Sequence, residues 1–197
     1  MIARRTRDLT SSREIAAALI AATAMMYFRL IALAAVFDIA IAIRLAPLFV
    51  MLGAATSGVA LVFSRTAAAA APNPAVSAAL QRNPLELNSA GLFALMLVIM
   101  SVATHFAVEI GPETGLNSLA FVSGLYDIDP FVVSLLQTHA AIAPSRVAQA
   151  IILATAANNL LKAVYTTIFA ERGAAIRAAS VLLVLAGVSA AYITLAN

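Results

Sequence analysis

Two acidic residues lie in the middle of an apolar stretch of the chain. The run reads Ser123-Gly124-Leu125-Tyr126-Asp127-Ile128-Asp129-Pro130, inside the largely apolar segment Leu116 to Ala140. A charge at the centre of a bilayer costs about 2.5 to 3.5 kcal/mol even on the lenient insertion scale, so these carboxylates need a basic partner, water or a cation. We predict that Asp127 and Asp129 form an ion or substrate site; a structural ion pair and a surface loop are the alternatives.

Pro130 gives these two acids a way to share one cavity. On an unbroken helix, side chains two residues apart point to nearly opposite sides. A proline lacks the backbone donor and disfavours helical geometry at the residue before it, here Asp129. The sequence therefore predicts a helix broken near Asp127 to Pro130, a device that builds ion sites at membrane depth.

A polar stripe on a later helix supplies partners for these acids. Its members follow three- and four-residue steps along Val147 to Phe169 and therefore share one face: Thr155, Asn158, Asn159, Lys162 and Thr166. Lys162 is expected to neutralise Asp127 or Asp129, either in a resting state that a cation or proton releases or as a permanent salt bridge.

Arg29 follows Tyr27 and Phe28 deep in the first apolar stretch. A guanidinium at that depth snorkels, binds an anion, or pairs inside the bundle with an acid such as Asp127. We expect the internal pairing.

The other polar candidates are weaker. His105 and His139 are isolated, which does not predict a metal site. Asn83-Pro84-Leu85-Glu86 has the pattern of a helix start, with Asn83 as the cap and Glu86 as the capping-box acid. The alternative places Glu86 and Asn88 at the cytoplasmic mouth of a ligand pathway.

Several chemistries have no counterpart in this sequence. It contains no cysteine, glycine-rich phosphate loop, metalloprotease helix or serine elbow. Tyr126-Asp127 is similar to one motif of intramembrane aspartyl proteases, but the second aspartate motif is missing. We therefore expect neither an enzyme nor a cofactor.

Composition shows what must position these residues. The chain is 63% apolar and 11% charged, with a mean hydropathy of +0.99, whereas soluble domains are about 25% charged. A helix needs about 20 apolar residues to cross the hydrocarbon core. The stretches near or beyond that length are Ile15 to Phe37, Leu45 to Phe63, Ala90 to Val108, Ile142 to Ala170 and Ala174 to Ala196, with Leu116 to Ala140 as a sixth.

Such stretches must be helical, because unsatisfied backbone groups are costly in lipid and the alternation of a barrel is absent. The predicted fold is all-α, a single polytopic transmembrane bundle of about six helices over residues 1–197, the fourth broken near Asp127 to Pro130. The basic segment 1–14 is expected in the cytoplasm ahead of a retained first helix, and 66–82 is expected to be a flexible cytoplasmic loop.

The distribution of basic residues leaves one crossing open. With the N-terminus inside, and Arg29 and Lys162 set aside, a full crossing by Leu116 to Ala140 places seven basic residues inside and three outside. If that stretch enters and returns, the count is eight inside and two outside. We prefer the full crossing, because it needs fewer special backbone arrangements at membrane depth.

Taken in order, the motifs resemble an uncharacterised bacterial membrane domain often fused behind an MgtC/SapB-type domain. The resemblance covers most of the chain from about Arg4. It rests on Tyr27-Phe28-Arg29, Asn83-Pro84-Leu85-Glu86-Leu87, Thr114-Gly115-Leu116, Ser123-Gly124-Leu125 with Asp127 and Asp129, and Ala157-Asn158-Asn159-Leu160-Leu161-Lys162-Ala163.

This resemblance implies a signature of Ser123, Gly124, Leu125, Asp127, Asp129, Asn158 and Lys162, a bacterial inner-membrane location and a part in divalent-cation homeostasis. This chain is expected to be a standalone, N-terminally shortened version, without the MgtC-type domain and a serine- and threonine-rich first helix. Pro130 and Asn159 depart from the alanine and the small polar residue of that pattern.

The sequence thus favours a bacterial inner-membrane transporter or channel-like protein for a cation, with a divalent ion as the first candidate. The expected pathway residues are Ser123, Asp127, Asp129, Asn158, Asn159, Lys162 and Arg29, with Asp127 and Asp129 as metal ligands. The alternative is an accessory subunit of a larger membrane complex. Expected partners are the lipid bilayer, a second copy or such a complex, and the cation; nucleic acid is not expected, because the arginines lie at membrane boundaries.

Overall fold

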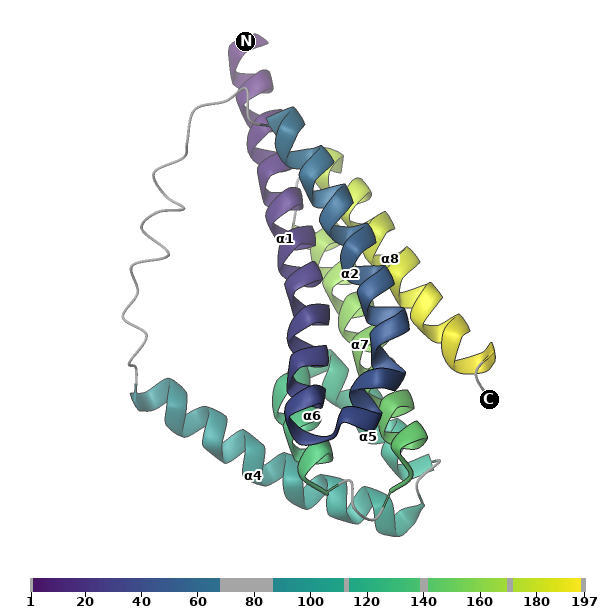
Figure 1. Ribbon diagram of the computed structural model, residues 1–197. Helices are drawn as coiled ribbons and strands as arrows, with labels where there is room; N and C mark the ends of the chain where they lie inside the picture. The colour runs from purple at the N-terminus through teal and green to yellow at the C-terminus, as the bar shows by residue number, and fades with distance from the viewer. Residues whose placement is uncertain (1, 68–86, 112–113, 139–141, 170–171, 196–197) are drawn as a thin grey trace.

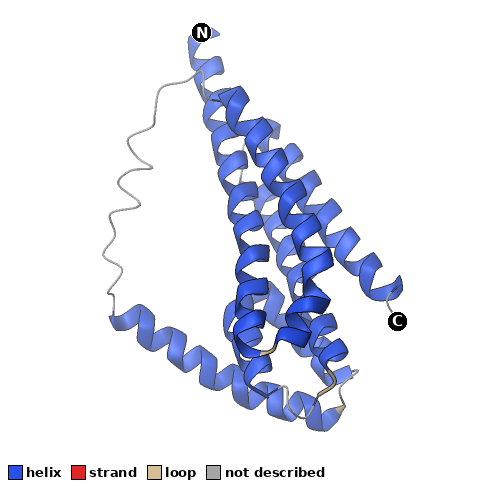
Figure 2. Ribbon diagram, in the orientation of Figure 1, coloured by secondary structure: helices blue, strands red, loops and turns tan. Residues whose placement is uncertain are grey.

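A computed structural model describes residues 2–67, 87–111, 114–138, 142–169 and 172–195 of the chain. These residues form seven α-helices and no strand (Figures 1 and 2). The all-α prediction is confirmed. The helices are α1 (Ile2–Phe37), α2 (Ile39–Ala67), α4 (Leu87–Ile110), α5 (Thr114–Tyr126), α6 (Ile128–Thr138), α7 (Pro144–Phe169) and α8 (Arg172–Leu195).

Five of these helices are long and apolar enough to cross a membrane, so the chain is a multi-pass membrane protein. Their spans match the five long stretches expected from hydropathy: Ala16–Phe37, Ile39–Ser64, Gly91–Glu109, Pro144–Ile168 and Ile176–Leu195.

α1 and α2 form a tight antiparallel hairpin with Asp38 as the joint (Figure 1). The Asp38 carboxylate accepts a 2.7 Å hydrogen bond from the backbone N–H of Ala40 and so caps the start of α2. This cap lets the second helix start at Ile39, ahead of Leu45, where the second apolar stretch was expected to begin. Along the hairpin the Phe28 ring packs on Gly53, where an added Cβ would lie 2.9 Å from a ring carbon.

The hairpin α5–α6 enters the bundle and turns back. Three contacts with α4 give its direction: Gly115 in α5 lies against Ala107, Ser123 near the end of α5 against Met100, and Ser134 in α6 against Thr104. Since Thr104 lies between Met100 and Ala107 along α4, α6 runs back towards the end where α5 began (Figure 1).

The preference for a full crossing by Leu116 to Ala140 is corrected by this arrangement. At 1.5 Å per residue, the 13 residues of α5 and the 11 of α6 give about 20 and 16 Å, each too short for a hydrocarbon core of about 30 Å. The break near Asp127 to Pro130 is where predicted, but it is the tip of a re-entrant hairpin.

α7 lies at the centre of the bundle. Within the chain, 61% of the α7 span is buried, compared with 11% of the α4 span. Most of the surface of α4 is therefore left to lipid or a partner. α7 packs against α8, α5, α2 and α6. Accordingly, the polar side chains of Thr155, Asn159 and Thr166 on α7 are buried within the chain.

Candidate functional site

The tip of the hairpin is a helix cap. Asp127 lies between the end of α5 at Tyr126 and the start of α6 at Ile128. Its Oδ1 accepts a 3.1 Å hydrogen bond from the backbone N–H of Asp129, the same arrangement that Asp38 makes at the start of α2. Pro130 follows in the first turn of α6, where its missing N–H leaves no helical bond unmade.

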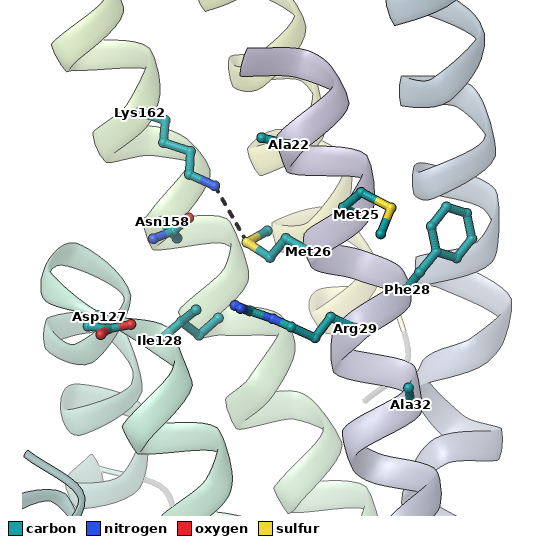
Figure 3. A pocket seen from close by; sticks show the side chains of 10 residues that line it. All are labelled: Ala22, Met25, Met26, Phe28, Arg29, Ala32, Asp127, Ile128, Asn158 and Lys162. Atoms are coloured by element: carbon teal, nitrogen blue, oxygen red, sulfur yellow. Dashed lines mark hydrogen bonds between the residues drawn. The ribbon is translucent and has the colours of Figure 1, made fainter. Parts of the chain in front are cut away.

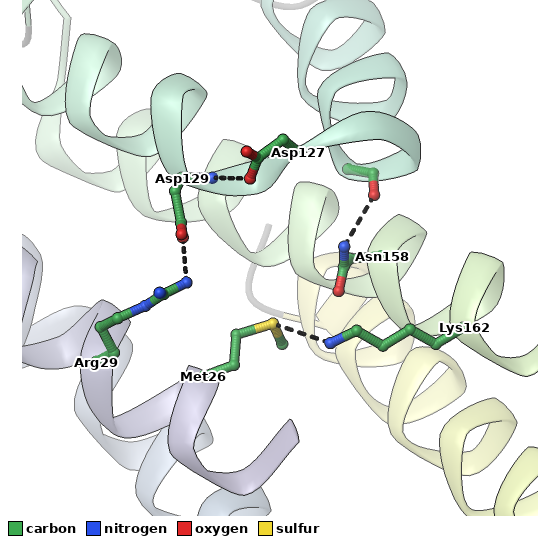
Figure 4. A network of polar contacts seen from close by, with 7 residues as sticks. Met26, Arg29, Asp127, Asp129, Asn158 and Lys162 are labelled. Carbon is green, nitrogen blue, oxygen red and sulfur yellow. Dashed lines mark hydrogen bonds and ion pairs between the residues drawn. The ribbon is translucent and has the colours of Figure 1, made fainter. Parts of the chain in front are cut away.

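The end of α5 is fixed against the middle of α7 by close backbone contact. A Cβ on Gly124 would collide with the carbonyl oxygen of Ala154 and lie 2.8 Å from the Cβ of Ala157, so only glycine fits there. The Nδ2 of Asn158 donates a 3.2 Å hydrogen bond to the Gly124 carbonyl oxygen (Figure 4). One of the carbonyls that a helix end leaves free is thereby satisfied.

Arg29 on α1 forms an ion pair with Asp129 on α6 (Figure 4). The internal pairing expected for Arg29 is present, but with Asp129 and not with the Asp127 suggested by the sequence. The Arg29 side chain is 53% exposed and that of Asp129 is 23% exposed. The guanidinium thus keeps part of its surface open, although Arg29 lies well inside the span Ala16–Phe37.

Lys162 has no carboxylate partner among the described residues. Its Nζ lies 3.5 Å from the sulfur of Met26 (Figure 4), and a thioether is only a weak acceptor. The expected salt bridge to Asp127 or Asp129 is therefore absent from this conformation. Asp127 instead accepts a backbone hydrogen bond, and Asp129 pairs with Arg29.

The rest of the polar stripe on α7 divides in two. Asn159 is fully buried and donates a 2.8 Å hydrogen bond to the hydroxyl of Tyr27. Thr155 and Thr166 donate to carbonyls of their own helix, those of Ile151 and Lys162. The Asn159 bond joins α7 to α1, and the two threonine bonds lie within α7. Asn158 and Lys162 are the members of the stripe that line a cavity.

A cavity of about 720 Å³ lies between α1, the hairpin tip and α7 (Figure 3). This volume is in the range of small-molecule sites. Its polar groups are the side chains of Arg29, Asp127, Asn158 and Lys162, and its apolar wall is Ala22, Met25, Met26, Phe28, Ala32 and Ile128. These four polar residues come from three separate segments of the sequence and were expected to share a site; they do line one cavity.

Two buried acceptors on α7 are unsatisfied. The Oδ1 atoms of Asn158 and Asn159 have no hydrogen-bond partner within the described part of the chain. A buried polar group without a partner costs about 1 to 3 kcal/mol. Asn158 also lines the cavity, and its carbonyl oxygen is an acceptor there that no described donor occupies.

Other expected pathway residues lie elsewhere. Ser123 is buried and its Oγ contacts the sulfur of Met100 on α4, 3.6 Å away, outside the cavity lining. Glu86 and His139 lie outside the described residues, as does the Asn88 side chain, so the cytoplasmic mouth stays a prediction. His105 pairs at 3.4 Å with Glu109 on the exposed end of α4.

The expected metal site at Asp127 and Asp129 is not assembled by carboxylates alone. In the described part of the chain, no three His, Cys, Asp or Glu side chains lie close enough together to hold a metal ion. Asp129 is also engaged by Arg29. The donors that remain for a cation are the Asp127 carboxylate and the Asn158 carbonyl oxygen, which suits an ion that keeps several waters.

Met26 is the residue of this site that the sequence analysis missed. It precedes Arg29 by three positions and therefore shares its face of α1. That spacing was a usable signal, but methionine in an apolar span is otherwise indistinguishable from packing.

Comparisons with known proteins identify a family and a relative. A family described as a domain of unknown function, DUF4010, matches residues 1–170. An uncharacterized protein of Aquifex aeolicus (strain VF5) is 33% identical over 93 residues, which cover 46% of this chain and 40% of that protein. The chain thus matches less than half the length of this relative. No solved structure matches.

Proposed function

The chain belongs to the DUF4010 family, and we propose that it moves a small cation across the membrane through the cavity at the tip of the α5–α6 hairpin. One observation carries this proposal: Asp127 lines the same cavity as Asn158, whose buried carbonyl oxygen has no hydrogen-bond partner among the described residues. Ionisable groups inside membrane proteins mark ion and substrate pathways.

The position of this cavity supports a transport role. Arg29 and Asn158 lie well inside the spans Ala16–Phe37 and Pro144–Ile168. Transporters place their sites near the midplane, at the ends of broken helices. The α5–α6 hairpin supplies such a pair of ends from both of its helices.

Asp127 is the proposed primary ligand, and Asn158 contributes its carbonyl oxygen. Asp127 keeps one carboxylate oxygen for a cation while the other caps α6. Asp129 is available only when Arg29 releases it. A monovalent cation needs Asp127 alone, whereas a divalent ion, the first candidate from the sequence resemblance, gains most from both acids.

The location in a bacterial inner membrane, with the N-terminus in the cytoplasm, belongs to this proposal. The re-entrant hairpin supports the orientation, because this topology gives the larger excess of basic residues on the N-terminal side, eight against two. The association with MgtC-type domains likewise stays a prediction.

An accessory role in a larger membrane complex is the second candidate function. The observation that favours it is α4, whose span is 11% buried within the chain. Co-purification in mild detergent separates the two candidates. A larger stoichiometric partner supports the accessory role, and a homo-oligomer or monomer supports transport.

The transport proposal is tested by uptake of radiolabelled Mn²⁺, a hard divalent ion, and of radiolabelled Na⁺ into proteoliposomes. Asp127→Asn should lower uptake on the order of 100-fold, since an uncompensated charge at the bilayer centre costs about 2.5 to 3.5 kcal/mol. Asp129→Asn should lower Mn²⁺ uptake more than Na⁺ uptake. Ser180→Ala, an exposed position on α8, is the control, and equal uptake by all variants would refute the proposal.

A further inference from the structure

Lys162 and Asp127 are the charged groups of the cavity that form no ion pair with another described residue. Arg29 pairs with Asp129, and Asp127 accepts the N–H of a neighbouring residue. The Lys162 ammonium has the weakly accepting sulfur of Met26, 3.5 Å from its Nζ. A lysine in an apolar span with this environment either needs an acceptor from outside the chain or gives up its proton.

The formal charges at the cavity balance before any ligand enters. Arg29 and Lys162 contribute two positive charges, and Asp127 and Asp129 contribute two negative charges. A monovalent cation at Asp127 would leave a net charge of +1, and a divalent cation +2. Because charge at the centre of a bilayer is costly, loading favours the loss of a positive charge from the protein.

We infer that the cavity exchanges its cation for a proton and that the Lys162 amine carries this proton. The inference rests on the proposed cation transport and adds its energy coupling. When the cation binds, the ammonium loses one proton to water and becomes a neutral amine. The cavity charge then falls from +1 to zero for a monovalent cation, or from +2 to +1 for a divalent one. When the cation leaves, the amine takes up one proton and neutrality returns.

Arginine cannot perform this step, so the two basic residues have different roles. A guanidinium keeps its proton in proteins, whereas a buried lysine changes its protonation readily. Arg29 is therefore the fixed counter-charge of Asp129. Lys162 is the group whose charge can vary with the ligand.

The charged and titratable surroundings of Lys162 come from several elements. Those nearest the cavity are Arg29 and Tyr27 on α1, Asp127 at the hairpin tip and Asp129 on α6. The described parts of α2, α5 and α8 contribute Arg44, Tyr126, Arg177 and Tyr192, none of which lines the cavity. The positive charge of Arg29 repels the Lys162 ammonium, and the negative charges of the two acids attract it.

The test uses proteoliposomes with a pH dye inside and the membrane potential clamped. Addition of Mn²⁺ or Na⁺ outside should raise the internal pH of wild-type vesicles, with about one proton leaving per cation that enters. Lys162→Met should still admit the radiolabelled cation, without the pH change. Lys162→Arg keeps the charge but cannot release it, so both cation uptake and the pH change should be lost.

The outcomes separate this inference from the transport proposal. Cation uptake by the wild type without any pH change overturns the proton exchange and leaves transport standing. A pH change of wild-type size in Lys162→Arg also overturns it, and this variant decides the matter if Lys162→Met does not fold. Absence of cation uptake in wild-type vesicles refutes the transport proposal itself.

Discussion

The side-chain amide of Asn158 donates a 3.2 Å hydrogen bond to the carbonyl oxygen of Gly124 and thereby joins the middle of α7 to the last turn of α5. This bond crosses 34 residues of sequence and ends at the place where the hairpin turns. It places the one unsatisfied oxygen of Asn158 beside the cavity that Asp127 also lines. The position of the candidate site therefore depends on how α5 is held against α7.

Removal of this hydrogen bond should loosen the hairpin tip. In Asn158→Ala the last turn of α5 loses its hydrogen-bond partner. Hydrogen exchange of the backbone amides at Tyr126 to Asp129 should then rise about threefold to tenfold, because this factor corresponds to the free energy of one interhelical hydrogen bond in a membrane. Asn117→Ala on the exposed side of α5 is the matched control. Unchanged exchange in both variants would show that Asn158 does not hold the tip.

A side chain at Gly124 should separate the two helices. Gly124→Ala puts a methyl group onto the carbonyl of Ala154, and overpacking of this kind costs about 1 to 3 kcal/mol. The melting temperature in detergent should fall. Gly58 lies on α2, and a Cβ added there would meet no atom within 4 Å. Gly58→Ala should therefore keep or raise the melting temperature, because alanine has the higher helix propensity. An equal fall of the melting temperature in both variants would contradict the packing of α5 on α7.

Much of this arrangement follows from local sequence. The helix break is predictable because Asp127 can cap the start of a helix, and because a proline such as Pro130 is tolerated only in the first turn of a helix. The five spans are predictable because lipid demands long apolar helices. The direction of α6 after the break is a tertiary property, fixed by contacts such as that of Ser134 with Thr104, which no short-range pattern contains.

The ionic partners show the same division. That Arg29 needs an acid follows from its depth in α1. That the acid is Asp129 and not Asp127 follows from the cap: Asp127 is turned towards the backbone of α6, and this leaves Asp129 to face α1. The contact of Lys162 with Met26 depends on the spacing between α1 and α7, which the sequence does not specify.

The two roles of Asp127 can be separated by substitution. Asparagine caps a helix about as well as aspartate, so Asp127→Asn should keep the thermal stability of the protein while losing cation uptake. Asp127→Ala should lose both, with about 0.5 to 2 kcal/mol of stability lost through the missing cap. Asp38→Ala, which removes the corresponding cap of α2, should lower stability by a similar amount and retain uptake. Full uptake by Asp127→Asn would confine Asp127 to a structural role.

The ion pair of Arg29 and Asp129 should appear as coupling between the two residues. Arg29→Met and Asp129→Asn should each destabilise the protein, and the double variant should be less unstable than their sum by about 1 kcal/mol, because Arg29 is half exposed. Chemical unfolding in mixed micelles measures the three values. The control is Arg44→Met, at an exposed position of α2; its effect on the free energy of unfolding should add to that of Asp129→Asn. If the effects of Arg29→Met and Asp129→Asn also add, a stabilising interaction between these two residues is excluded.

Thiol labelling measures directly whether water reaches the cavity between α1, the hairpin tip and α7. The chain has no cysteine, so each introduced thiol is unique. Ala32→Cys lines the cavity, and Val50→Cys lies at a similar depth on the exposed surface of α2, because Phe28 packs on Gly53. A membrane-impermeant thiol reagent should modify Ala32→Cys in intact vesicles and leave Val50→Cys unmodified. Equal protection of both thiols would contradict ion access to Asp127, since the charged groups would then face lipid or packed protein.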